Sequence, residues 1–216
     1  MTNLDHVVVA ANTLEQGVAY LETQLGVSIP KGGEHPDMGT HNHLLQLGNN
    51  AFLELISINP NGTPPKRPRW FGLDDPFIQA RLKECPQLLT WVVNTRNLEA
   101  LQAKASFSLG QTTTLSRGDL SWDFALPQDG RLLAGGILPY VMQWHTDVHP
   151  AGKMADLGCR LKSLTLHHSY PDWLRSRLQE LGAADLVEIE PLEANALPYM
   201  SVEIETPSGT KVLKSS

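Results

Sequence analysis

The chain has 216 residues, enough for one large or two small domains, and 41% hydrophobic with 19% charged residues is typical of a soluble globular protein. The formal net charge of −6 argues against general nucleic-acid binding, because phosphate recognition needs a basic face. No apolar run approaches the ~20 residues of a membrane span, so we expect no membrane partner. Cys85 and Cys159 form no motif with each other, and no signal-like N-terminus is visible. We therefore expect two reduced thiols in a cytoplasmic protein.

Residues 1–58 predict the order strand, helix, strands. The strand covers residues 4–11, and Thr13 with Gln16 forms a capping-box pattern at the start of a helix. Apolar residues at helical spacing follow, and Gly26 ends the helix. After a loop or short edge strand, residues 39–58 predict a β-hairpin, because the turn Gly48-Asn49-Asn50 tolerates positive φ angles.

The predicted hairpin has unusual polar content. His41, Asn42 and His43 lie in its first strand, and Glu54 interrupts an apolar second strand. A carboxylate in mid-strand is costly to bury unless it is paired, hydrogen-bonded or bound to a metal. The alternative is a strand whose Glu54 face is exposed to water, as antiparallel sheets often allow.

The same order returns along the chain. A proline-rich connector with an apolar anchor at Trp70-Phe71 and a short helix over 76–83 leads to a second copy, at a spacing of roughly 85 residues that indicates internal duplication. The second copy has a strand over 88–95, a helix over 97–105, and strands over 111–115, 120–126 and 138–145. A third, more compact copy has a strand over 161–166, a helix over 171–181, and strands over 186–189, 199–205 and 211–213.

A repeated βαβββ unit with a His in its first strand and a Glu in its last resembles the vicinal oxygen chelate superfamily. More specifically, the chain resembles the glyoxalase-like domain proteins of the glyoxalase, bleomycin-resistance and dioxygenase group. The matching segments are Leu4-Asp5-His6-Val7, Gly39-Thr40 with Asn42, Phe52-Leu53-Glu54-Leu55, Leu138-Pro139-Tyr140, Trp144-His145 and His149-Pro150.

This resemblance implies an α+β fold of repeated βαβββ modules that form cupped mixed sheets with a cleft on the concave side. Paired modules over 1–60 and 87–146 would make a glyoxalase-like domain over 1–150, and a third module over 151–216 would pack on the same fold. Modules of this kind commonly pair between chains, so a homodimer is expected. The expected partner is a small-molecule ligand or substrate.

The resemblance also implies a metal site. His6 and Glu54 occupy the two ligand positions of the first module, and imidazole with carboxylate suits a divalent Zn, Fe, Mn or Ni ion. By register, Trp91 stands in place of His6 in the second module and Gln143 stands near the position of Glu54. Because Trp cannot ligate a metal, an ion would need His6 and Glu54 with an extra donor: His43, His41 or Gln143.

Two functions are compatible with these residues. In the first, His6 and Glu54 bind an ion that polarises a small oxygenated substrate, and His43 or Glu54 moves a proton in a lyase, isomerase or dioxygenase reaction. We expect His41 and His43 to line the cleft in preference to Asn42. The candidates for substrate binding are Asn42, His41, Trp91, Gln143 and Trp144.

The second function is metal-free binding or sequestration of a small molecule, as in resistance proteins of the superfamily. Trp91, Trp144, Phe52 and Tyr140 would then form the cleft walls, although residues such as Trp91 and Trp144 more often belong to the core. A His6–Glu54 hydrogen bond without metal would be a polar anchor, and it would still hold His6 as a possible base.

Overall fold

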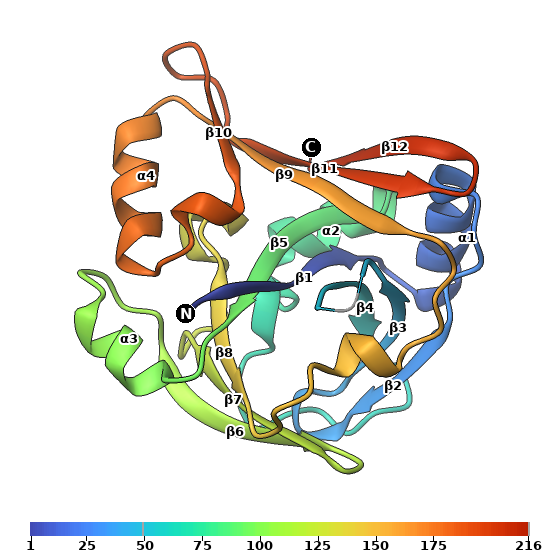
Figure 1. Ribbon diagram of the computed structural model, residues 1–216. Helices are drawn as coiled ribbons and strands as arrows, with labels where there is room; N and C mark the ends of the chain where they lie inside the picture. The colour runs from blue at the N-terminus through green and yellow to red at the C-terminus, as the bar shows by residue number, and fades with distance from the viewer. Residues whose placement is uncertain (49, 216) are drawn as a thin grey trace.

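The chain runs three times through the order strand, helix, three strands (Figure 1). The computed structural model describes residues 1–48 and 50–215. The first unit contains β1 (Asn3–Ala10), α1 (Leu14–Leu25), β2 (Lys31–His35), β3 (Thr40–Gln46) and β4 (Phe52–Ile58), and α2 (Pro76–Glu84) lies in the connector. The second contains β5 (Gln87–Asn94), α3 (Leu98–Lys104), β6 (Gln111–Arg117), β7 (Leu120–Leu126) and β8 (Tyr140–Trp144). The third contains β9 (Arg160–His168), α4 (Pro171–Glu180), β10 (Glu188–Pro191), β11 (Tyr199–Thr206) and β12 (Gly209–Lys214).

The predicted start and end of helix α1 are confirmed. The Thr13 hydroxyl accepts a hydrogen bond from the Gln16 backbone N–H at 3.2 Å, and Gly26 ends the helix with a φ of 71°. The predicted hairpin is also confirmed, with β3 and β4 paired antiparallel. Asn49 of its predicted turn lies outside the described residues.

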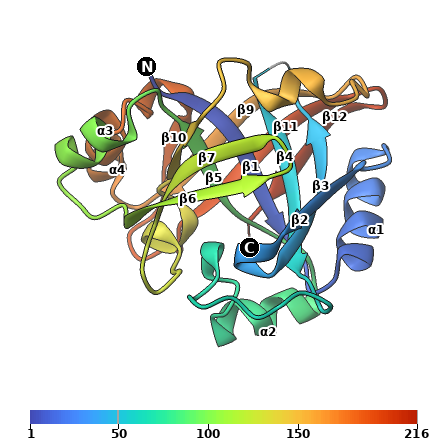
Figure 2. The same cartoon turned by 90° about the horizontal axis from the view of Figure 1, so that it is seen from below.

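The first two units build one eight-stranded mixed sheet, sheet A, in the order β2-β3-β4-β1-β5-β8-β7-β6. Strands β1 and β5 join the units antiparallel, and each pairs parallel with the last strand of its own unit. The sheet curls strongly (Figure 2), so that Arg117 at the end of β6 reaches Asn42 of β3 and packs against Gly33 of β2. The predicted α+β fold of repeated βαβββ modules with cupped sheets is confirmed.

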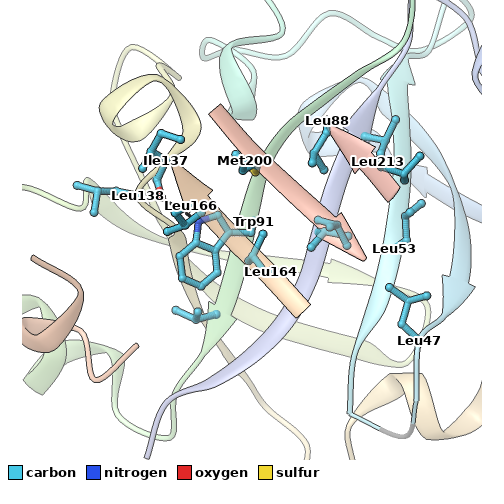
Figure 3. Close-up of a cluster of buried hydrophobic side chains, with 14 of the residues drawn as sticks. Leu47, Leu53, Leu88, Trp91, Ile137, Leu138, Leu164, Leu166, Met200 and Leu213 are labelled. Atoms are coloured by element: carbon cyan, nitrogen blue, oxygen red, sulfur yellow. Dashed lines mark hydrogen bonds between the residues drawn. The ribbon is translucent and has the colours of Figure 1, made fainter. Parts of the chain in front are cut away.

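The third unit makes a separate four-stranded sheet, sheet B, in the order β10-β9-β11-β12. It packs on the convex side of sheet A through a continuous apolar core (Figure 3), where Leu164 and Met200 of sheet B lie beside Trp91 of sheet A. Its first strand β9 lies between β10 and β11, so the third unit repeats the chain order of the others but not their strand order. Sheet B therefore supports sheet A from behind.

The concave side of sheet A carries a second, aromatic cluster. Its largest members are Trp70, Phe71, Trp122, Phe124 and Tyr140. Trp70 and Phe71 are buried, as predicted for the anchor of the connector, and Phe71 has a positive φ of 58° with its N–H donating to the Tyr140 hydroxyl at 3.2 Å. The connector thus covers one part of the concave face.

Two further features concern the whole chain. Cys85 is exposed, Cys159 is buried, and both are free thiols. Within residues 1–48 and 50–215, no helix has the length and apolar character needed to cross a membrane.

Candidate active site

His6 and Glu54 lie close together on the concave face of sheet A. Their strands β1 and β4 are parallel neighbours in which His6 pairs with Phe52 and Val8 with Glu54, so the two side chains are diagonal neighbours. His6 Nε2 lies 3.6 Å from Glu54 Oε2, and the imidazole stacks on the Phe52 ring with a centroid distance of 4.5 Å. Both side chains are buried, so Glu54 does not lie on an exposed sheet face.

Asp5 holds the other side of the His6 ring. Asp5 Oδ1 lies 2.7 Å from His6 Nδ1, and Oδ2 accepts hydrogen bonds from Trp144 Nε1 at 2.7 Å, Asn94 Nδ2 at 2.8 Å and His149 Nε2 at 3.0 Å. Burial by itself would raise the pKa of Asp5, but the hydrogen bonds from His149 and His6 hold it well below its usual range. The ionised carboxylate therefore favours the His6 tautomer with the proton on Nδ1, and Nε2 faces Glu54 as an acceptor.

A β-bulge brings Asp5 and His6 to the same site. Consecutive strand residues normally face opposite sides of a sheet, which would separate these two side chains. In the pairing of β1 with β5, however, Leu4 faces Val93 and His6 faces Val92, so Asp5 is an extra residue on β1. The bulge is the local feature that makes the Asp5–His6 contact possible.

Asn42 holds the Glu54 carboxylate in place. Its Nδ2 donates to Glu54 Oε1 at 2.6 Å, and its Oδ1 accepts from the Gly33 backbone N–H at 2.8 Å and from Arg117 Nη1 at 3.3 Å. These partners fix the orientation of the amide, since only its nitrogen can donate to the carboxylate. Glu54 Oε2 is left to face His6.

These groups line a small cavity of about 40 Å³ with largely apolar walls. His35 also lines it, and burial lowers the pKa of His35 to about 4, so its imidazole is neutral at pH 7. Aromatic side chains form most of the remaining wall: Phe52, Trp70, Phe71, Trp122, Phe124 and Trp144. Electrostatic interactions are stronger in such a water-poor space than in bulk water.

The expectation that His41 and His43 line the cleft in preference to Asn42 is wrong. Asn42 is buried and lines the cavity, and its neighbours along β3 alternate with it to the opposite face. There His41 Nε2 contacts the Ser57 hydroxyl at 2.8 Å, and His43 Nδ1 contacts the Ile29 carbonyl oxygen at 2.7 Å. His43 therefore cannot move a proton in this cavity.

Two other predicted ligand-binding residues lie elsewhere. Trp91 is fully buried in the core between the sheets, where its Nε1 donates to the Ile137 carbonyl oxygen at 2.9 Å. Gln143 accepts the Leu98 backbone N–H at 2.8 Å at the start of α3. The cavity thus brings together His6, Glu54, Asn42 and Trp144 from the predicted set, but not His41, His43, Trp91 or Gln143.

Sequence reasoning missed Asp5, His149, His35, Arg117 and Trp70 as site residues. Asp5 stands inside the Leu4-Asp5-His6-Val7 segment that carries the resemblance, so that segment is the one signal that could have found it. Strict alternation of side chains along β1 would place Asp5 on the face opposite to His6, because this rule takes no account of the bulge. No comparable signal marks Arg117, which reaches the site only through the curling of sheet A.

The donor set does not fit a resident metal ion with the usual three or four protein ligands. Two tetrahedral ligands at about 2.1 Å from an ion are about 3.4 Å apart, close to the 3.6 Å between His6 Nε2 and Glu54 Oε2. Asp5 is already occupied by hydrogen bonds, and the expected extra donors lie away from this pair. In the described part of the chain, no group of three or more His, Cys, Asp and Glu side chains could hold an ion.

Paired βαβββ units in a curled sheet, with a His and a Glu from the first and last strands of one unit on its concave side, define a protein of the vicinal oxygen chelate superfamily. The sequence comparison agrees with this class. The chain belongs to the glyoxalase-like domain family, whose model matches residues 4–182. No curated protein matches the chain.

One of the following solved structures shares the fold, and the other two are similar to part of the chain, all at low sequence identity. A hypothetical protein from Staphylococcus aureus is 14% identical, with a TM-score of 0.59 over 99% of this chain and 85% of that one. Methylmalonyl-CoA epimerase from Mycobacterium tuberculosis is 19% identical, with a TM-score of 0.39 over 66% of this chain and 86% of that one. A variant of the Streptomyces coelicolor epimerase is 15% identical, with a TM-score of 0.40 over 69% of this chain and 98% of that one.

Proposed function

We propose that the protein is an enzyme of lyase or isomerase type that moves a proton on a small oxygenated substrate, with Glu54 and His6 as its catalytic residues. The observation that carries this proposal is the pair of atoms His6 Nε2 and Glu54 Oε2, 3.6 Å apart in the cavity. Because Asp5 binds the proton on His6 Nδ1, both atoms of the pair are acceptors. A substrate C–H or O–H that enters the cavity would supply the missing proton.

Each neighbour has a role in this proposal. Glu54 Oε2 takes the proton, because Oε1 is held by Asn42 at 2.6 Å. His6 shares that proton through Nε2, and the resulting imidazolium would lie between the carboxylates of Glu54 and Asp5, as in other carboxylate-oriented histidines. The aromatic walls exclude water and strengthen these interactions.

Replacing Glu54 with Gln tests the proposal. The substrates would be small oxo and hydroxy compounds. NMR would follow the exchange with D₂O of the C–H proton next to their carbonyl or hydroxyl carbon. We expect E54Q to lower the exchange rate by about 10²- to 10⁴-fold, the usual contribution of a general base. Glu205→Gln, on an exposed position of β11, is the matched control and should exchange at the wild-type rate. Equal rates for E54Q and the wild type would refute the role of Glu54.

A divalent ion between His6 Nε2 and Glu54 Oε2 is the second candidate, favoured by their separation of 3.6 Å. Such an ion would supply Lewis acidity, and a redox-active one would be required for a dioxygenase. Elemental analysis and titration with Zn, Fe, Mn and Ni separate the two candidates. Exchange that persists after chelation supports the first. An ion that restores the reaction in the wild type but does not bind His6→Ala supports the second.

Metal-free binding without turnover is favoured by the aromatic walls alone. It predicts a ligand that quenches tryptophan fluorescence equally in the wild type and in E54Q, with no exchange in either. The homodimer and the cytoplasmic location stay predictions.

A further inference from the structure

In the described part of the chain, Arg117 is the only arginine or lysine side chain that lines the cavity. It stands at the end of β6, half-buried, and extends across to the opposite edge of sheet A. A guanidinium offers five N–H donors in a planar fork. In the described residues Arg117 makes one hydrogen bond, from Nη1 to Asn42 Oδ1 at 3.3 Å, and no ion pair.

The bond to Asn42 leaves Arg117 available for a ligand. The same Asn42 oxygen already accepts the Gly33 N–H at the shorter distance of 2.8 Å. Other arginines of the chain form ion pairs with carboxylates, as Arg69 does with Asp74 at 2.6 Å. Arg117 instead lines a cavity whose one carboxylate among the described residues, Glu54, is bound to Asn42 through Oε1 and faces His6 through Oε2.

A buried donor without a hydrogen-bond partner belongs to a residue of the same wall. Trp70 is 3% exposed, and its Nε1 has no hydrogen-bond partner in the described residues. The great majority of buried donors in proteins are paired, so this indole N–H is an exception, and it adds to the positive character of the wall. The Arg117 guanidinium and the Trp70 indole N–H are both donors, and His35 next to Trp70 is neutral.

A glycine in strand β2 leaves room for the Arg117 side chain. A Cβ added to Gly33 of β2 would lie 3.0 Å from Arg117 Cδ. Glycine at this position lets the arginine stem lie directly on the edge strand. The placement of the guanidinium is therefore part of the packing of the two sheet edges.

We infer that the substrate is a small carboxylate, bound by Arg117 through its carboxylate oxygens. The inference rests on the proposed function for the proton that Glu54 removes. Guanidinium and carboxylate match as two parallel N–H···O bonds, which a lysine cannot reproduce.

The test is binding of lactate and malonate, with lactamide and malonamide as uncharged controls, followed by tryptophan fluorescence. We expect saturable quenching by the carboxylates and at least tenfold weaker quenching by the amides. Arg117→Gln should weaken carboxylate binding by about 10- to 100-fold, and Arg117→Lys should restore part of it. Arg175→Gln, on an exposed position of α4, is the matched control and should bind as the wild type does.

The outcomes separate this inference from the proposed function. Carboxylate binding that is lost in R117Q but kept in E54Q supports Arg117 whether or not any proton exchanges. Equal binding by R117Q and the wild type overturns the inference, as does stronger binding of inorganic phosphate or of the amides. Proton exchange on neutral compounds that is lost in E54Q but kept in R117Q would leave the proposed function standing and refute the carboxylate.

Discussion

At the scale of single residues, the site depends on where a few protons lie. Asp5 accepts hydrogen bonds from four side chains and has no exposed surface, so its negative charge is stabilised by those donors in place of water. An amide at this position would offer one acceptor oxygen where the carboxylate offers two, leaving buried donors unpaired at a cost of about 1–3 kcal/mol each. Asp5 therefore acts as a positioning residue for His6.

His35 makes the free energy of unfolding depend on pH. Burial lowers its folded pKa from 6.5 to about 4, so between these values the unfolded chain binds a proton that the folded chain does not. The stability contribution is complete above pH 6.5 and is lost as the pH falls toward 4, with a total of about 3 kcal/mol. Urea unfolding at several pH values should show this loss in the wild type and a smaller loss in His35→Phe, where burial still lowers the pKa values of the half-buried His41, His167 and His168.

Thr40→Val is the control for His35. The Thr40 hydroxyl contacts His35 Nδ1 at 3.3 Å, so the variant removes this bond but keeps the imidazole. It should lower stability by about 1 kcal/mol at every pH and leave the slope between pH 4 and 6.5 unchanged. A slope in His35→Phe as steep as that of the wild type would contradict the assignment to His35.

At the scale of elements, the sequence predicts the strands and helices well because their signals are local. The Thr13 cap, the Gly26 stop and the glycines and prolines of the turns need no knowledge of distant residues. The facing of β3 was predicted wrongly, because both of its faces carry polar side chains. The pairing of β3 with β4 determines which face lines the cavity. Leu44 stands opposite Glu54, and Asn42 lies two residues before Leu44, so both share the face of Glu54.

The glycines of edge strand β2 give a prediction at this scale. A Cβ on Gly32 would lie 2.2 Å from Asn42 Oδ1 and 3.0 Å from the Asn42 backbone oxygen, so Gly32→Ala must displace the amide that holds Glu54. We expect a loss of about 1–3 kcal/mol in urea unfolding, because a buried carboxylate oxygen loses its donor. Proton exchange should fall in parallel.

Gly33→Ala on the same strand is the control for Gly32→Ala. Its added methyl group would meet only the flexible side chain of Arg117, at 3.0 Å. It should cost less stability than Gly32→Ala. Equal losses for the two variants would show that the effect comes from strand β2 in general and not from Asn42.

At the scale of the whole molecule, the cavity depends on parts of the chain that do not line it. The connector between the sheets contributes His149 to Asp5, and Gln46 Nε2 of β3 donates to Ala151 of the same connector at 2.6 Å. Sheet B then packs behind the strands that carry His6 and Glu54. The strand order of sheet B and the curling that brings Arg117 to the site are long-range features, and local sequence signals do not determine them.

This arrangement predicts that the two sheets unfold together. Leu166 of β9 is fully buried in the shared core, and Leu166→Ala should destabilise the protein by about 2–5 kcal/mol. Far-UV circular dichroism reports both sheets, whereas tryptophan fluorescence reports mainly Trp70, Trp91, Trp122 and Trp144 of the sheet A region. We expect one coincident urea transition for both probes, shifted to lower urea in the variant. Leu197→Ala, at a position 87% exposed, should leave the midpoint unchanged. A dichroism transition that precedes the fluorescence transition would mean that sheet B unfolds independently of the sheet that carries the site.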